Sequence, residues 1–287
     1  MPVDKSKIEW TDSTWLPVTG CTKVSPGCKF CFAERVAKRY WGARKFTDVQ
    51  VHADRLDQPL RWRRPRRVFV NSMSDLFHEK VSVAFLAEVF DVMAAAERHT
   101  FQILTKRPDR MLAAMRDDVP HYAATTMAGD TALSTVLEIG EWPLPNVWMG
   151  VSVEDQARAD ERIPLLLQTP AAVRFLSVEP LLGPVTIPTV HSFGDQRWDG
   201  PRIDWVILGG ESGGPSERAL VTKGRTYSDR APFFAWRPKD EALDWVRSLR
   251  DQCVAAGVPF FFKAWGGPTS KSGGRQLDGK TWDEYPC

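Results

Sequence analysis

The chain has 287 residues, a formal net charge of +2 and 43 % hydrophobic residues. This composition is typical of a folded globular protein and excludes a disordered chain, and the near-neutral charge selects no partner by itself. No apolar run reaches the ~18 residues of a membrane span, and the N-terminal segment lacks the apolar core of a secretory signal peptide. We therefore expect a cytoplasmic protein that does not enter a membrane, whose clustered cysteines stay reduced and serve as metal ligands rather than disulfides.

Short apolar, β-branched runs recur along the chain, and several end in polar residues or glycine. Near-continuous apolar character is expected of strands that are buried on both faces of a parallel sheet. The predicted strands are residues 67–77, 100–108, 147–155, 173–183, 204–214 and 258–267, with a weaker candidate at 14–21.

Helical patterns lie between these strands. Residues 82–99 and 240–257 each place an apolar stripe on one face, and residues 154–169 begin with acidic residues but contain Pro164, which predicts a break or kink. The alternation predicts an α/β fold, a partial (β/α) barrel of about six to seven mostly parallel strands, although a doubly wound sheet fits equally well. In both architectures ligands gather at the carboxyl ends of the strands.

The whole chain, residues 1–287, is expected to form one domain of this kind, with a cysteine loop at residues 19–35. Two regions interrupt the alternation. Residues 117–146 are loop-like with one weak helix, and residues 184–239 combine a Pro/Gly-rich insertion (184–203) with a further irregular piece (219–239). Loops of this length in a compact domain are usually lids or binding surfaces.

The stretch "TGCTKVSPGCKFCFAER" holds three of the chain's five cysteines, Cys21, Cys28 and Cys31, in the spacing C-x6-C-x2-C, and a helix is expected directly after it. A structural zinc ion needs a fourth ligand, for which only the distant His52 or His78 is available. A catalytic zinc with three cysteines is uncommon. A [4Fe–4S] cluster held by three cysteines leaves one iron open to an external ligand, so the missing thiol becomes a functional feature.

The cysteine loop follows the first candidate strand, with Phe30 directly before Cys31. In these features the chain resembles the radical S-adenosylmethionine superfamily. The resemblance implies a [4Fe–4S] cluster whose open iron binds S-adenosylmethionine, and reductive cleavage of that cofactor to a radical. The chain departs from the commonest pattern of the superfamily, which has three residues between the first two cysteines and a Gly-Gly-Glu element after the second strand; here six residues intervene and "NSMSDLF" stands at that place.

Three longer stretches are similar to a family of phage and bacterial three-Cys-motif proteins. They are "EWTDSTWLPVTGCTKVSPGCKFCFAER", "GGESGG" and "FFFKAWGG" with the later "GRQLDGKTWDEYP", and the likeness runs from residue 8 to the C-terminus. This second resemblance implies no particular reaction.

Polar residues follow the predicted strands, where a barrel mouth would form. After the second strand come Asn71, Ser72, Ser74 and Asp75. The superfamily binds the amino group of its cofactor at this place, and Asp75 offers the matching charge. The competing interpretation is a turn that closes the strand through Asx and Ser side chains.

Further strand ends supply more candidates. Lys263, set among phenylalanines, and Glu211, in "GGESGG", are the expected catalytic residues, with Glu179 or Glu211 as the expected partner of Lys263. Lys106 and Arg107 follow the third strand. The remaining candidates for cofactor binding are Ser152, Glu154, Glu179, Gly209 and Gly210.

A basic segment, "LRWRRPRRVF", precedes the second strand. It is either a solvated loop or a patch that contacts the phosphates of nucleic acid while its tryptophan stacks on a base. The candidate residues are Arg61, Trp62, Arg63, Arg64, Arg66 and Arg67.

Together these features predict an iron–sulfur enzyme that cleaves S-adenosylmethionine with an electron from a donor protein and acts on a nucleic acid or nucleotide. The alternative is a nucleic-acid-binding module that zinc or a cluster stabilises without catalysis. A third hypothesis is a nucleotide hydrolase or transferase with structural cysteines. Cys253 is expected to be a buried core thiol, and Cys287 a free one.

Overall fold

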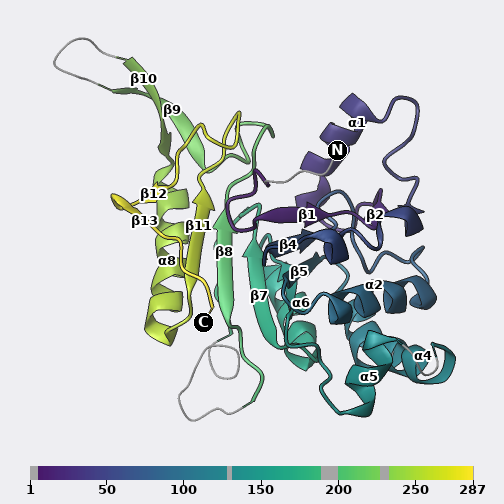
Figure 1. Cartoon of the computed structure of the whole chain (residues 1–287). Coiled ribbons are helices and arrows are strands. Elements are labelled where there is room, and N and C mark those ends of the chain that lie inside the picture. The colour runs from purple at the N-terminus through teal and green to yellow at the C-terminus, as the bar shows by residue number, and fades with distance from the viewer. Residues whose placement is uncertain (1–5, 128–130, 189–199, 227–232, 287) are drawn as a thin grey trace. The chain divides into compact units, whose positions relative to one another are not determined.

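The computed structural model describes residues 6–127, 131–188, 200–226 and 233–286. Its main sheet has seven strands in the order β1-β4-β5-β6-β7-β8-β11 and forms a half-barrel, so the α/β partial barrel predicted from the sequence is confirmed (Figure 1). Six of the seven predicted runs contain one strand of this sheet, and the weaker candidate at 14–21 overlaps the last two residues of β1. The strands of the sheet are β1 (Ser13–Trp15), β4 (Arg67–Val70), β5 (Thr100–Thr105), β6 (Val147–Ser152), β7 (Val173–Val178), β8 (Trp205–Gly209) and β11 (Phe260–Ala264).

The chain divides into two compact units. Unit 1 comprises Met1–Val151 and Arg162–Phe175, and unit 2 comprises Ser152–Glu161 and Leu176–Cys287. Helix α6 (Gln156–Gln168) has residues in both. It runs through Pro164 without ending, so the predicted break does not occur. Ile163 and Leu166 beside the proline are fully buried, and their packing offsets the backbone hydrogen bond that proline cannot make.

In unit 1, β1 pairs with β4, β4 with β5 and β5 with β6, all in parallel. Helix α2 (Val83–Ala95) packs against α4 (Val119–Thr126) and α5 (Ala132–Glu138). The Ser82 hydroxyl begins α2 by accepting the Phe85 amide at 3.2 Å. The predicted apolar stripe of this helix is buried, with Val89 and Met93 fully enclosed.

Residues 117–146 contain more helix than the sequence predicts. The short helix α3 (Pro108–Ala113) and a π-helical turn, η4 (Ala114–Asp118), lead into α4, and α5 follows. Helix α5 begins with a capping box in which the side chains of Thr131 and Ser134 bind each other's backbone amides. Helices α4 and α5 have eight and seven residues, too few to repeat an apolar stripe that the sequence would reveal.

The cysteine loop of unit 1 starts from a small antiparallel pair, β2 (Val18–Thr19) with β3 (Gln50–Val51). A 3-10 turn, η1 (Pro26–Cys28), lies inside the loop, and helix α1 (Phe32–Tyr40) leaves it (Figure 1). The predicted helix after the loop is thus confirmed. Two more 3-10 turns, η2 (Ala53–Arg55) and η3 (Pro59–Arg61), lead to β4.

In unit 2, β8 and β11 pair in parallel, and α8 (Asp240–Ala256) packs against β11. Cys253 is fully buried on the inner face of α8, as predicted, and Gly257 ends the helix in the left-handed conformation at φ 66°. A small hairpin of β12 (Gln276–Leu277) and β13 (Lys280–Thr281) follows β11. Cys287 lies outside the described residues.

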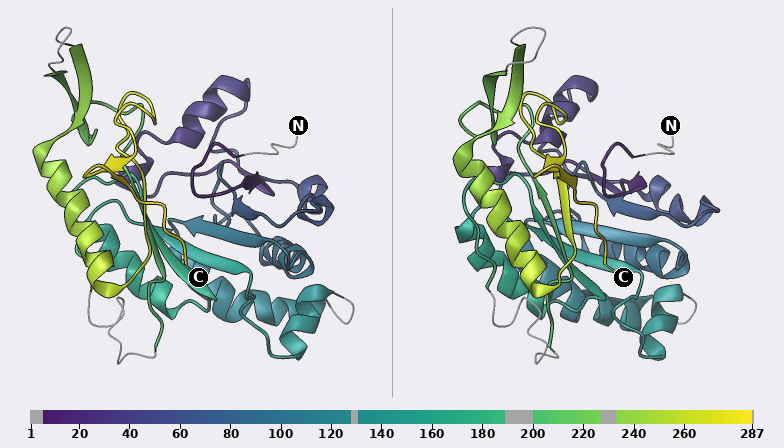
Figure 2. Two further views of the ribbon diagram at one scale, coloured as in Figure 1. Left: turned by 60° about the vertical axis from the view of Figure 1, so that its left-hand side comes forward. Right: turned by 90° about the vertical axis from the view of Figure 1, so that its left-hand side faces the viewer.

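The sequence predicts residues 219–239 as irregular, but in the structure they form an antiparallel ribbon. Strand β9 (Val221–Thr226) pairs with β10 (Phe233–Pro238), with Val221 opposite Pro238. Figure 2 shows this hairpin extending beyond the N-terminal end of α8. The sequence lacks a clear strand signal here because polar and basic residues interrupt the apolar ones along the ribbon. Of the other predicted insertion, residues 189–199 lie outside the described part of the chain.

Within the part of the chain that the structure describes, no helix is both long and apolar enough to cross a membrane.

Candidate functional site

The backbone that leads into Cys21 is fixed to the turn after β4. The Val18 amide donates to Asn71 Oδ1 at 3.0 Å, and the Ser74 hydroxyl donates to the Val18 carbonyl at 2.8 Å. The Gly20 amide donates to the Met73 carbonyl at 3.1 Å. Asn71 and Ser74, which the sequence predicts as cofactor ligands, therefore use these side-chain oxygens to hold the start of the cysteine loop.

Gly20 permits the close approach of two backbone segments at this point. Its φ is +92°, and a Cβ there would lie 2.5 Å from the Asp48 carbonyl oxygen. Any other residue would push the loop away from residues 46–48. Cys21 follows directly, and its amide donates to the Phe46 carbonyl at 2.9 Å.

Part of the turn after β4 keeps hydrogen-bonding capacity. Asn71 is 3 % exposed, and its Nδ2 has no partner among the described residues. Asn71 also has a positive φ of 63°, which costs a non-glycine residue conformational energy. Ser72 beside it is half-buried. The role of these two residues in cofactor binding stays a prediction.

Asp75 has a complete set of donors within unit 1. Its Oδ1 accepts the Thr105 hydroxyl at 2.7 Å and the Phe77 amide at 3.0 Å. Its Oδ2 accepts the Lys106 amide and Arg107 Nη1, both at 3.1 Å. The carboxylate is 7 % exposed and already paired with a cation, so the structure gives it a partner other than the ammonium group predicted from the sequence.

Arg107 connects this carboxylate to the cysteine loop. Its Nη1 lies 3.5 Å from Cys21 Sγ, and its Nη2 donates to the Thr22 carbonyl at 3.1 Å and hydroxyl at 2.8 Å. Its side chain is 9 % exposed, and Nε faces Glu79 at 3.3 Å. The sequence shows that Arg107 ends a strand but does not show these contacts, because its partners are remote along the chain.

Burial raises the pKa of the Cys21 thiol to about 11, and the nearby Asp75 charge adds to this effect while Arg107 opposes it. Cys28 contributes to the same rise in the pKa of Cys21, because ionising one thiol opposes the ionisation of the other. Cys21 is consequently a neutral thiol at pH 7, and a metal must displace its proton to bind.

Both histidines that the sequence offers as zinc ligands contact threonines beside Cys21. His52 Nε2 lies 2.7 Å from the Thr19 hydroxyl, and His78 Nε2 lies 2.9 Å from the Thr22 hydroxyl. The Lys80 amide donates to His78 Nδ1 at 3.2 Å, so His78 carries its hydrogen on Nε2. Burial lowers the pKa of His78, which keeps it neutral. Both of its ring nitrogens are therefore in use.

Cys28 and Cys31 are half-buried at the far end of the loop. Cys28 Sγ lies 3.7 Å from the Ser25 hydroxyl, and Cys31 is the N-cap residue of α1. The ammonium group of Lys23, bound by Glu34 at 2.9 Å, lies within electrostatic range of both thiols. Across the described residues, no three His, Cys, Asp or Glu side chains are grouped closely enough to hold a metal ion. The distances alone therefore do not define a metal site. The residues fit a cluster through their chemistry, because three thiols in one loop suit iron and zinc.

In unit 2, Lys263 and Glu179 form an ion pair with Nζ and Oε1 2.5 Å apart. Glu179 is one of the two partners expected for this lysine from the sequence. A Cβ on Gly209 would lie 3.3 Å from the Glu179 carboxyl carbon, and one on Gly210 would lie 2.1 Å from the Trp265 carbonyl oxygen. The two glycines therefore admit a carboxylate and a crossing backbone segment.

Glu211 has a different partner from the one expected. Its two carboxylate oxygens accept Nε and Nη2 of Arg218, both at 2.8 Å, and the residue is 7 % exposed. This bidentate pair closes residues 211–218 into a loop. Ser152 and Glu154, also in unit 2, are buried at the end of β6, and the Leu182 amide donates to the Glu154 carbonyl at 2.8 Å. The catalytic and cofactor roles of these residues stay predictions.

The basic segment leads into β4, whose first residue is Arg67, at the amino edge of the strand whose carboxyl end meets the cysteine loop. Arg61 pairs with Asp57, Arg67 binds Asp12 at 3.0 Å, and Arg66 stacks on Trp62 at 5.1 Å. Arg63 and Arg64 are exposed and make no hydrogen bond or ion pair with the described residues. The structure thus does not bring the basic segment and the cysteines of unit 1 together.

No curated protein and no solved structure matches the chain. Residues 5–224 and 236–286 do match one protein family, which is described as "Protein of unknown function (DUF5131)". The matched ranges include the cysteine loop, the strand ends of both units and the whole of α8. The chain therefore belongs to the DUF5131 family.

Proposed function

We propose that this chain is an iron–sulfur enzyme that holds a [4Fe–4S] cluster through Cys21, Cys28 and Cys31 and cleaves S-adenosylmethionine reductively. The observation that carries the proposal is the place of the three-cysteine loop. Its first cysteine is linked through Arg107 to the carboxyl ends of β4 and β5 in a parallel partial barrel. Active sites of parallel α/β folds lie at this edge.

The residues around Cys21 have defined tasks in this proposal. Arg107 donates an N–H group to the Cys21 sulfur and so stabilises a metal-bound thiolate, and Asp75 holds the guanidinium group in place. The proton that Cys21 carries at pH 7 leaves when the metal binds. The unpaired Asn71 Nδ2 and the Ser72 hydroxyl offer hydrogen bonds to the cofactor's polar end.

When bound, the cluster supplies one electron to the sulfonium group of S-adenosylmethionine. An electron-donor protein has to provide that electron. The proposed substrate is a nucleic acid or nucleotide, a choice supported by the exposed Arg63 and Arg64 and by the abundance of tryptophan. Lys263 and Glu211 are proposed to take part in the reaction through their ion-paired side chains.

Anaerobic purification followed by iron, sulfide and zinc analysis tests the cluster. We expect a brown protein with about four iron and four sulfide ions per chain, lost in Cys28→Ala. The buried Cys253→Ala is the matched control and keeps its iron, because this thiol lies in the core of unit 2. Stoichiometric zinc without iron contradicts the proposal and favours the zinc-stabilised binding module.

The second step tests the reaction. With dithionite as reductant and S-adenosylmethionine present, the iron-loaded protein is expected to release 5′-deoxyadenosine, and the Cys28→Ala variant is not. Iron-loaded protein that releases none under strong reducing conditions contradicts the radical mechanism while leaving the cluster in place.

A further inference from the structure

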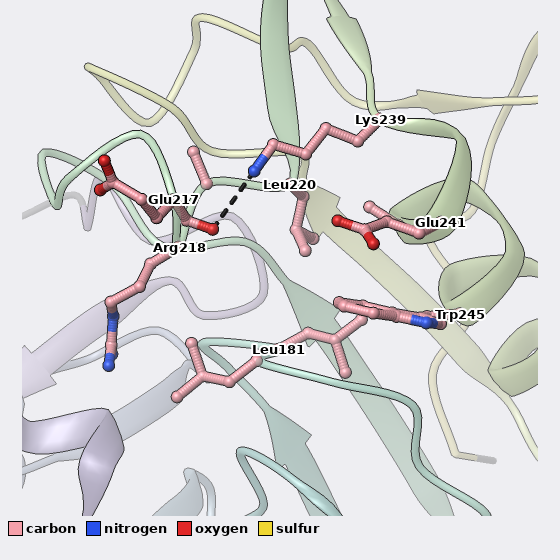
Figure 3. Close-up of a pocket in the computed structure, with 10 residues that line it drawn as sticks. Leu181, Glu217, Arg218, Leu220, Lys239, Glu241 and Trp245 are labelled. Carbon is pink, nitrogen blue, oxygen red and sulfur yellow. Dashed lines mark hydrogen bonds between the residues drawn. The ribbon is translucent and has the colours of Figure 1, made fainter.

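Unit 2 contains a cavity of about 200 Å³ between the start of α8, the loop before β9 and the segment after β7. Trp245, Leu181 and Leu220 give it an apolar wall, and Glu241 and Lys239 stand at its rim (Figure 3). None of these five residues is among the strand-end candidates, and the cavity shares no residue with the cysteine loop. Arg218, the partner of Glu211, also lines the cavity.

Some polar groups that line this cavity already have hydrogen-bond partners, and others do not. Lys239 Nζ already donates to the carbonyls of Ser216 and Glu217, at 3.0 and 3.2 Å, and so closes one wall (Figure 3). The Glu241 carboxylate and the Trp245 indole N–H make no hydrogen bond or ion pair with any residue that the structure describes. The cavity therefore offers a flat aromatic face and an unpaired carboxylate.

An adjoining open hollow of about 480 Å³ shares Lys239 and Glu241 with the cavity. It adds Thr222, Arg237 and Pro238 from the hairpin and Asp240 from the start of α8. The Arg237 side chain lies across Gly224, where a Cβ would come within 2.9 Å of its Nε. Its guanidinium group is exposed and unpaired among the described residues. This group presents five N–H donors to an anion.

These features together select the chemistry of a ligand. The tryptophan face and the leucines suit one planar ring system, for which 200 Å³ leaves room. The carboxylate accepts two hydrogen bonds side by side, so the ring must present two adjacent N–H donors. Among the common nucleobases guanine does so, through N1–H and the N2 amino group. Uracil and thymine place carbonyl oxygens beside their N–H and would repel the carboxylate.

We propose that this cavity binds a guanine nucleotide, with the base against Trp245, its N1 and N2 hydrogens on Glu241 and its phosphate near Arg237. The proposal is a binding site only and does not depend on the cysteines or on any reaction of the chain. A free nucleotide and a guanine within a nucleic acid strand present the same chemistry.

Isothermal titration of the full chain with guanosine, inosine and adenosine 5′-monophosphates tests the base. We expect saturable binding of guanosine monophosphate and at least tenfold weaker binding of inosine monophosphate, which lacks one donor to the carboxylate. Glu241→Gln and Trp245→Leu should each weaken the guanine complex at least tenfold. Asp244→Asn, on the same helix but outside the cavity, is the matched control and should leave the affinity unchanged.

Two further arms complete the test. Arg237→Gln should weaken guanosine monophosphate but not guanosine, since it removes a phosphate contact alone. Comparing a guanine-containing tetranucleotide with guanosine monophosphate distinguishes a strand from a free nucleotide as the source, and an all-thymine tetranucleotide is the control for the base. Equal affinity for guanosine and adenosine monophosphates overturns the proposal, as does guanine binding that Glu241→Gln and Trp245→Leu leave unchanged while both variants melt like the parent chain.

Discussion

Arg107 is the residue on which the arrangement around Cys21 depends. It neutralises Asp75, contacts the Cys21 sulfur and binds Thr22 while almost completely enclosed. Asp75 lies 32 positions away in the sequence and Cys21 86 positions away. The sequence shows that Asp75 and Arg107 each follow a strand, but a pairing over such separations depends on strand order, which no local pattern contains.

Removing one member of this pair should destabilise the protein strongly. Arg107→Gln leaves the Asp75 carboxylate buried without its cation and should lower the free energy of unfolding by about 3–5 kcal/mol. Arg61→Gln, which breaks the exposed pair with Asp57, is the control and should cost less than about 1 kcal/mol. Urea denaturation measures both variants. Equal losses would mean that the buried pair has no special role in stability.

His99 gives unit 1 a dependence on pH. It is 1 % exposed, Nε2 lies 3.0 Å from the Pro59 carbonyl, and Nδ1 has no partner among the described residues. Burial lowers its pKa from the usual 6.5, so the unfolded chain takes up a proton more readily than the folded one. The contribution of neutral His99 to the free energy of unfolding is therefore fully present above about pH 6.5 and falls as the pH drops below that value.

The matched variants isolate this effect. His99→Gln keeps a donor for the Pro59 carbonyl and should reduce the slope of unfolding free energy against pH, between pH 5 and 6.5, by up to about 1.4 kcal/mol per pH unit. The same substitution at the exposed His121 is the control. Chemical denaturation at a series of pH values measures the slopes, and identical slopes for His99→Gln and the parent would contradict the prediction.

At the scale of the elements, burial decides what can be predicted from the sequence. The strands of the main sheet are short apolar runs, and β8 is buried along its whole length, so its continuous apolar pattern indicates a strand. The ribbon of β9 and β10 and the short helices α4 and α5 lack a continuous apolar stripe, and their sequences therefore resemble irregular segments. In α6 the buried neighbours of Pro164 outweigh a local signal for a break.

The loop after β8 supports a prediction at this scale. A Cβ on Gly210 would lie 2.1 Å from the Trp265 carbonyl oxygen, so Gly210→Ala must separate two backbone segments and should cost about 3 kcal/mol of unfolding free energy. Gly257→Ala is the control: its Cβ would meet nothing within 4 Å, and only its left-handed φ of +66° is penalised, by about 1 kcal/mol. Urea denaturation measures the loss of unfolding free energy in both variants. Similar losses would contradict the inference that Gly210 is required by the close backbone approach.

At the scale of the whole molecule, the fold class and the position of the cysteine loop after the first strand can be predicted from the sequence. The division into two units cannot, because the strand–helix alternation continues through both. The candidate site is predictable in its residue types but not in its pairings. Glu211 is one of two partners expected for Lys263, yet it binds Arg218, which belongs to no recognisable motif.

Loading the proposed cluster should stabilise the folded chain as a whole. A ligand that binds only the folded state raises the unfolding temperature in proportion to its binding free energy. Reconstitution with iron and sulfide under nitrogen should therefore raise the unfolding temperature of the parent chain and of Cys253→Ala relative to their own metal-free forms. Differential scanning fluorimetry measures the shift, and an equal shift in Cys28→Ala would show that the iron is bound elsewhere.

The contacts around Gly20 also bear on the order in which a metal site could form. Cys21 is tied to the sheet by Gly20, Thr22 and Arg107 before any metal arrives, whereas Cys28 and Cys31 lie on the outgoing part of the loop. A metal that meets Cys21 first finds one ligand whose conformational entropy has already been lost in folding. The 3-10 turn and the start of α1 already order Cys28 and Cys31, so a metal that joins the three thiols has to shift this outgoing part of the loop while Cys21 stays in place.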